Sequence, residues 1–189
     1  MPADHLTVYA ALARAFDAVD VRWYLVGARA AILHGVSRFS EDVDVTVDPA
    51  GREVGDLIEA LGDQAFALQV DDSDFIRQTS VLPLYHRPTD TPVDVILASS
   101  GIEALFLEAA IEIELDGVPV PVARPEDLIV MKILAGRHKD VDDVEAILRA
   151  QGDRFDDARV RDLLGQLEAA LSQSDLLPLF ERCRHRAGG

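Results

Sequence analysis

Two carboxylates separated by a single residue, Asp42 and Asp44, are the first residues in the sequence whose types and spacing suggest chemistry. They begin the segment Asp42–Asp48, where polar residues alternate with valines, and this alternation predicts a strand with one apolar and one acidic face. Carboxylates on one face repel each other by about 1 kcal/mol in water, and a hard divalent cation relieves that repulsion. Because Mg²⁺ typically binds one or two protein carboxylates together with water and substrate phosphates, the pair indicates metal-dependent phosphate chemistry.

A third carboxylate, Asp94, lies in the apolar segment Pro92–Leu97, which also predicts a strand. If that strand lies beside Asp42–Asp48, Asp94 completes an acidic cluster. The alternative is an exposed strand face with solvated acids, which the Asp-x-Asp pattern taken alone favours. The low preference of aspartate for strands argues in the other direction.

The motifs of several common enzyme classes are absent from the sequence. It contains no Gly-x-x-x-x-Gly-Lys, Gly-x-Gly-x-x-Gly, His-Glu-x-x-His or Gly-x-Ser-x-Gly. Their absence argues against P-loop, Rossmann, zincin and ordinary hydrolase interpretations.

The composition restricts the class of protein further. The chain has 189 residues and a net charge of −16, which predicts one domain with a helical appendage and excludes nonspecific nucleic-acid binding driven by overall charge. No uncharged run approaches the ~18 residues of a membrane helix, and the N-terminus lacks the features of a secretory signal. Cys183 is the single cysteine, so no internal disulfide forms. We therefore expect a soluble cytoplasmic protein that binds no membrane.

The elements that must position the three carboxylates follow from periodicity and turn residues. Strands are expected at 21–26, 42–48, 75–86 and 92–97, and a hairpin at 111–122 turning at Asp116-Gly117. Helices are expected at 6–19, 28–35, 54–61, 102–110, 125–136, 139–150, 156–170 and 175–186. The fold class is therefore α/β (α+β), with a core over residues 1–123 and a C-terminal helical region over 124–189 that packs on it.

The order of residues from Tyr24 to Val45 resembles the signature of the polymerase-β-type nucleotidyltransferase superfamily. A strand ends at Gly27, Ala28 opens a helix, and the Asp42-Val-Asp44 strand follows. Ala28 stands where the superfamily usually has a second Gly or a Ser. The segment 124–144 resembles the C-terminal helical part of small bacterial nucleotidyltransferases related to the AbiEii/AbiGii toxin group. Together with Asp94, the two segments cover roughly residues 21–150.

The resemblance implies a nucleotidyltransferase-like mixed sheet flanked by helices, and a role for individual residues. Asp42, Asp44 and Asp94 would be catalytic and would hold Mg²⁺, with Mn²⁺ as the alternative ion, and Asp94 would accept the proton of the acceptor hydroxyl. The residues implied in binding the nucleotide phosphates or the acceptor are Gly27, Ala28, Arg38, Lys132, Arg137 and Lys139.

Each of these positions also has a structural explanation. Gly27 is common at any turn from strand to helix. Lys132, one of only two lysines, is alternatively a surface lysine on an apolar helix face. Arg38, Arg137 and Lys139 are alternatively solvated charges or structural ion pairs. Asp140 and Asp143 are expected to position Lys139 or Arg137 across the helix junction. The basic tail at Arg182–Arg186 fits a helix end, and its other interpretation is local attraction for RNA.

The function implied is transfer of a nucleoside monophosphate from an NTP to a hydroxyl acceptor. The acceptor is a tRNA, a protein or a small molecule, and a cognate antitoxin is an expected partner if the protein is a toxin. An inactive nucleotide-binding or interaction protein with the same fold is the main alternative, and Ala28 favours it. A metal-dependent phosphoesterase using the same acids is the third.

Overall fold

The computed structural model describes residues 3–70, 72–99 and 101–188. The chain divides into two compact units. The first joins the residues up to Arg29 with Phe39–Ala123, and the second joins Ala30–Arg38 with the residues from Arg124 onward. The change from strands to helices near residue 124 coincides with one boundary between the units. The order of elements gives no sign that the short segment 30–38 belongs with the later helices.

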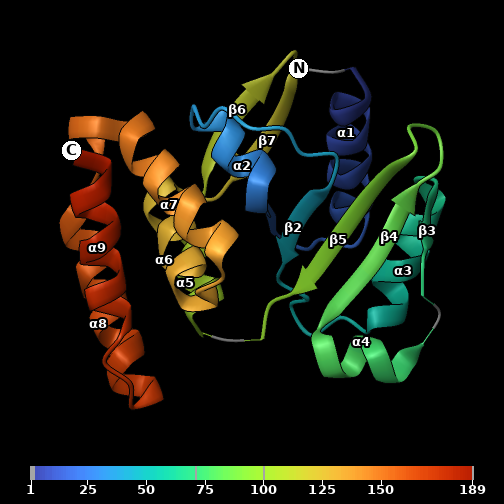
Figure 1. Ribbon diagram of the computed structural model, residues 1–189. Coiled ribbons are helices and arrows are strands. Elements are labelled where there is room, and N and C mark those ends of the chain that lie inside the picture. Colours follow the sequence, from blue (N-terminus) through green and yellow to red (C-terminus); the bar gives the residue numbers. More distant parts are fainter. Residues whose placement is uncertain (1–2, 71, 100, 189) are drawn as a thin grey trace. The chain divides into compact units, whose positions relative to one another are not determined.

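Within the described residues, the first unit contains a seven-stranded mixed sheet with the order β3-β4-β5-β2-β1-β7-β6 (Figure 1). Strands β2 and β5 are parallel, as are β1 and β7, and the other neighbours are antiparallel. The strands are β1 (Trp23–Val26), β2 (Val43–Val47), β3 (Phe66–Leu68), β4 (Val81–His86), β5 (Thr91–Leu97), β6 (Ile111–Leu115) and β7 (Val118–Val122). The mixed α/β class expected from the sequence is confirmed.

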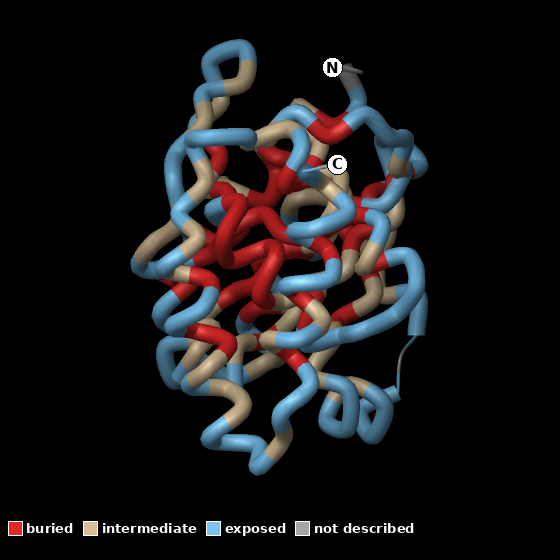
Figure 2. Tube along the Cα trace, turned by 60° about the vertical axis from the view of Figure 1, so that its left-hand side comes forward, coloured by how far each residue is buried: buried red, intermediate tan, exposed pale blue. Residues whose placement is uncertain are grey.

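Helix α1 (Ala3–Ala18) contacts β5, β7 and α3 (Val54–Asp63) in this unit. The unit also contains α4 (Ser73–Thr79) and α5 (Gly101–Ala109), and α2 (Gly27–Leu33) begins in it directly after β1. Figure 2 colours the buried residues red and the exposed residues pale blue along the chain. The apolar face of α1 contributes Val8, Tyr9, Leu12 and Phe16 to the core, all with no exposed surface.

The predicted hairpin at 111–122 is confirmed, with β6 and β7 antiparallel around Asp116 and Gly117. Both turn residues have positive φ, 48° and 86°, as a two-residue type I′ turn requires. Gly tolerates this conformation freely and Asp is among the few other residues that adopt it.

The predicted strand at 75–86 is wrong in its first half. Residues Ser73–Thr79 form helix α4, and β4 begins only at Val81. The Asp72 side chain accepts hydrogen bonds from the backbone N–H groups of Asp74 and Phe75, which caps a helix and outweighs the β-preference of the apolar residues that follow. Ser80 then ends the helix with a φ of 54°. The short strand β3 has no counterpart in the sequence prediction.

The second unit is built from helices α6 (Pro125–Ala135), α7 (His138–Gln151), α8 (Asp157–Leu171) and α9 (Leu176–Gly188), with a short 3₁₀ turn at Gly152–Arg154. Helix α6 contacts each of the other three. As the sequence predicts, α6 starts with Pro125 in its first turn and ends at Gly136, whose φ is 63°. Among the helices of the described residues, none is both long and apolar enough to cross a membrane.

Candidate active site

Asp44 and Asp94 lie directly opposite each other on the neighbouring parallel strands β2 and β5. Adjacent strands are about 4.8 Å apart, and residues paired in this register project to the same face of the sheet. Both residues are half-buried. The predicted adjacency of the two acidic strands is therefore confirmed, and strands about fifty residues apart in the chain bring two carboxylates together.

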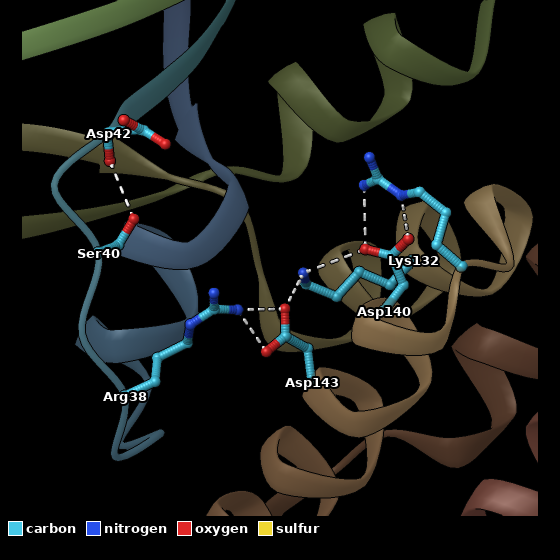
Figure 3. Close-up of polar contacts among 7 residues, drawn as sticks. Arg38, Ser40, Asp42, Lys132, Asp140 and Asp143 are labelled. Carbon is cyan, nitrogen blue, oxygen red and sulfur yellow. Dashed lines mark hydrogen bonds and ion pairs between the residues drawn. The ribbon is translucent and has the colours of Figure 1, made fainter.

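Asp42 lies immediately before β2 and is exposed (Figure 3). Its backbone carbonyl accepts a hydrogen bond of 3.4 Å from Ser40 Oγ. Burial, and secondly the negative charge of Asp42, raise the pKa of Asp94 above its ordinary value of 3.8. Asp42, just before β2, thus acts electrostatically on Asp94 of the neighbouring strand β5.

The opposite face of the same two strands fixes them in the core. Their alternate residues have almost no exposed surface: Val43, Val45, Val47, Val93 and Val95. Burying a valine side chain contributes roughly 1.5–3 kcal/mol. The register of each strand is therefore strongly determined, because a slip by one residue would expose the valines and bury the aspartates.

Gly27 follows β1 directly as the first residue of α2, and it lies against the carboxylate of Asp44. A Cβ at position 27 would overlap Asp44 Oδ2 and lie 2.8 Å from Asp44 Cγ. The backbone at Gly27 has a φ of 67°, which other residues rarely adopt. Glycine is thus required at this turn by both conformation and space. Ala28 follows within α2 and is partly exposed.

The oxygen donors of Asp44 and Asp94 are of the kind that a hard divalent cation prefers. In the part of the chain that the structure describes, no three His, Cys, Asp or Glu side chains are grouped closely enough to hold a metal. Mg²⁺ needs only one or two protein carboxylates when water and substrate phosphates complete its shell. Asp44 and Asp94, which are paired across β2 and β5, are suited to supply these two carboxylates, and Asp42 lies nearby.

In the second unit, Lys132 and Arg38 share one carboxylate, that of Asp143 (Figure 3). Lys132 Nζ lies 2.6 Å from Asp143 Oδ2, and Arg38 Nη1 lies 2.5 Å from each Asp143 oxygen. The Lys132 side chain is only 11% exposed. Lys132 is therefore an ion-paired, largely buried lysine rather than one extending from the helix surface.

Asp140 extends this cluster to Arg137. Arg137 Nε lies 2.5 Å from Asp140 Oδ2, and Lys132 Nζ lies 3.8 Å from Asp140 Oδ1. Burial alone would raise the pKa of Asp140, but the hydrogen bonds and charge of Arg137 outweigh it and the pKa is lowered. Three of the four cations named from the sequence thus meet around two aspartates. The fourth, Lys139, is exposed and outside this cluster.

The basic tail on α9 is paired within the second unit. Arg184 Nε lies 3.0 Å from Asp157, and Arg186 Nη1 lies 3.4 Å from Glu145. These partners fit the interpretation of a helix surface with satisfied charges. Cys183 is buried, and burial raises the pKa of its thiol, which makes it a poor nucleophile.

Arg29 is a buried cation that the sequence analysis did not single out. Only 5% of it is exposed, and within the described residues its Nε and Nη2 have no hydrogen-bond partner. Burial, and secondly Arg29, lower the pKa of His5, whose Nε2 lies 3.4 Å from the Glu41 carbonyl. In a sequence where nearly every basic residue is arginine, nothing local distinguishes this one.

Comparison with known families identifies the fold of this site. Residues 6–156 match the family described as "Nucleotidyltransferase of unknown function (DUF6036)". The chain belongs to this nucleotidyltransferase family. The narrower resemblance to the AbiEii/AbiGii toxin group stays a prediction. A comparison with curated proteins finds no match.

Solved structures of nucleotidyltransferases share the fold of this family member. The solution structure of the antibiotic-resistance factor ANT(2'')-Ia has a TM-score of 0.60 at 16% identity, covering 91% of this chain and 95% of that one. Its crystal structure with adenylyl-2''-tobramycin has a TM-score of 0.58 at 16% identity, covering 88% and 98%. An antigenic nucleotidyltransferase-like protein from Paracoccidioides brasiliensis has a TM-score of 0.53 at 18% identity, covering 93% and 91%. At these identities the similarity concerns the fold alone.

Proposed function

We propose that the protein transfers a nucleoside monophosphate from an NTP to a hydroxyl acceptor and releases pyrophosphate. The observation that carries this proposal is the pairing of Asp44 with Asp94 on adjacent parallel strands, with Gly27 against the Asp44 carboxylate. Membership of a nucleotidyltransferase family supports it. Gly27, Asp44 and Asp94 come from three separate segments of the chain and lie together at one sheet, on or next to its strands β1, β2 and β5.

Asp44 and Asp94 are the residues that would hold Mg²⁺ or, alternatively, Mn²⁺, and Asp42, the third acid of the prediction, adds its negative charge nearby. When bound, the ion supplies positive charge to the triphosphate and to the in-line transition state. Asp94 is the candidate base for the acceptor hydroxyl, because its raised pKa makes it a better proton acceptor than an ordinary aspartate. The absence of a side chain at Gly27 allows its backbone to approach phosphate, with Ala28 next to it.

The cations of the second unit are proposed ligands for phosphate or acceptor. The ammonium of Lys132 has three N–H donors, so an anionic ligand would either share it with Asp143 or take the place of Asp143 by exchange, with Arg38 remaining to neutralise that carboxylate. Arg137 is 62% exposed on its side chain while still bonded to Asp140, so part of its guanidinium is accessible to a ligand. Lys139 is exposed and needs no such exchange.

The acceptor is a hydroxyl of a small molecule, a protein or a tRNA. A net charge of −16 repels a polyanion, so it favours a neutral or cationic acceptor over tRNA. The fold relative crystallised with adenylyl-2''-tobramycin supports a small-molecule acceptor as the first class to test. A toxin role with an antitoxin partner is the less supported assignment.

The experiment is incubation of the full chain with each α-labelled NTP, Mg²⁺, and separate pools of aminoglycosides and other small molecules, protein and RNA. Transfer of label to one pool with release of pyrophosphate is expected. Asp44→Asn should abolish transfer, while Asp48→Asn, an acid at the end of the same strand, should retain it. Equal labelling by the wild type and Asp44→Asn would contradict the proposal.

The second candidate is a nucleotide-binding protein without catalysis, and Ala28 is the observation that favours it. A serine there would offer a hydroxyl to phosphate, and alanine cannot. Nucleotide binding measured by calorimetry, with no pyrophosphate released in any acceptor pool, would support this candidate. Ala28→Ser should then strengthen nucleotide binding without producing transfer.

A further inference from the structure

Phe39 is the most exposed large apolar side chain in the described part of the chain, with 76% of its surface accessible. The next most exposed, Leu171, reaches 52%. Burying a phenylalanine ring stabilises by roughly 1.5–3 kcal/mol, and in the described residues Phe39 takes part in no ring–ring or cation–π contact. Most of this aromatic surface is therefore accessible to a ligand.

The residues that follow Phe39 make polar contacts within the first unit (Figure 3). Ser40 Oγ donates to the Asp42 carbonyl at 3.4 Å, and the Glu41 carbonyl lies 3.4 Å from His5 Nε2. The segment that links Phe39 to Asp42 is thus in contact with its own unit.

Phe39 also lies close to the proposed chemistry along the chain. Asp42 follows Phe39 by three positions, and an extended chain spans at most about 3.6 Å per residue, so the two Cα atoms are within about 11 Å. That reach is comparable with the extent of a nucleoside triphosphate from its phosphates to its base. A nucleotide whose phosphates lie at Asp42 and Asp44 can therefore place its base on this ring.

We propose that Phe39 is the residue on which the base of the nucleoside triphosphate stacks, an inference that rests on the proposed nucleotidyl transfer. Every base has an aromatic face, so stacking adds affinity and tolerates different bases. Phe39 accordingly contributes to nucleotide affinity without selecting strongly among ATP, GTP, CTP and UTP.

The test is calorimetric titration of the full chain with MgATP and with magnesium tripolyphosphate, which has no base. Phe39→Ala should raise the Kd for MgATP about 5- to 150-fold, because stacking is worth roughly 1–3 kcal/mol per base. Phe39→Tyr should restore binding, and Phe75→Ala, which removes another exposed phenylalanine of the same unit, should leave it unchanged. The Kd for tripolyphosphate should be the same in all four proteins.

Three results would overturn the inference while leaving nucleotidyl transfer standing. They are unchanged MgATP affinity in Phe39→Ala, an equal loss of MgATP and tripolyphosphate binding, and an increase confined to the KM of the acceptor. A wild-type protein that binds no nucleotide with Mg²⁺ would instead contradict the proposed function itself, and the inference with it. Because Phe39 is exposed, its variants are expected to fold normally.

Discussion

The Asp44 carboxylate lies so close to Gly27 that it fills the space where a side chain at position 27 would begin. Val26, the residue before Gly27, is paired with Asp44 across β1 and β2. The turn that leaves β1 and the position of the carboxylate on β2 therefore depend on each other.

Gly27→Ala should impair both stability and transfer. A left-handed φ costs a non-glycine residue about 1–2 kcal/mol, and the added Cβ must displace the Asp44 carboxylate. Because a displacement of about 1 Å at a catalytic group costs on the order of 100-fold in rate, we expect a loss of that size in pyrophosphate release. Calorimetry should show a Tm lowered by roughly 2–8 °C.

Gly55→Ala is the matched control for that substitution. Gly55 lies in α3, where an added Cβ meets nothing within 4 Å. Alanine in a helix is about 1 kcal/mol more favourable than glycine, so this variant should be slightly more stable and fully active. Equal effects of the two substitutions would show that Gly27 has no special relationship with Asp44.

Asp42→Asn should lower the pKa of Asp94 in the metal-free protein. Burial raises that pKa first and the charge of Asp42 adds to it, so removing the charge leaves only the first cause. Carboxyl-carbon NMR titration of Asp94 measures the change directly. Asp48→Asn should have a smaller effect, and an unchanged Asp94 titration in Asp42→Asn would show that the two carboxylates do not interact.

Asp94→Asn should stabilise the metal-free protein at pH 7. A folded-state pKa above 3.8 means that the stability contribution of Asp94 is present in full below pH 3.8 and is lost as pH rises through the folded pKa. The uncharged amide of asparagine avoids that loss. Urea unfolding should therefore give the variant a higher free energy of unfolding than the wild type at pH 7, but not at pH 3.5. A variant that is more stable than the wild type only at pH 3.5 would contradict the burial of the Asp94 charge.

Lys132→Met should destabilise the protein by on the order of 2 kcal/mol, because it removes one of two cations from the buried Asp143 carboxylate. Lys139→Met, at the other lysine of the chain, should change the free energy of unfolding by less than about 0.5 kcal/mol, since that side chain is exposed. Urea denaturation of both variants makes the comparison. Equal stabilities would show that the Lys132 ion pair contributes nothing.

The free energy of unfolding of Asp127→Asn should increase relative to that of the wild type as pH rises from 4 to 7. Burial is the main cause that raises the pKa of Asp127 from 3.8 to about 6, although Arg159 lies 2.7 Å away and opposes it. Its stability contribution is therefore present below pH 3.8 and lost through about pH 6, a change on the order of 2–3 kcal/mol.

Urea unfolding at pH 4 and pH 7 measures that change as the difference between Asp127→Asn and the wild type. Asp142→Asn, at an exposed position on α7, is the control and should show no such trend. A constant difference between Asp127→Asn and the wild type at the two pH values would contradict the raised pKa.

Local patterns were sufficient for much of the fold. The alternation through Asp42–Asp48 predicted β2, because one buried face imposes a period of two. Pro125 and Gly136 predicted both ends of α6, and Asp116-Gly117 predicted the hairpin turn, because each needs a backbone conformation that few residues adopt. The first half of 75–86 was misread, because the cap made by Asp72 overrides an apolar pattern of ambiguous period.

The sequence by itself determined which residues could do chemistry and on which face of their own strand or helix they lie. Only the tertiary structure decided their neighbours: Asp94 beside Asp44, Asp44 against Gly27, and Lys132 with Arg38 on Asp143. These partners lie between 11 and 105 positions apart along the chain. Periodicity describes one element at a time, whereas strand order and register result from packing the whole hydrophobic core, so no local pattern contains them.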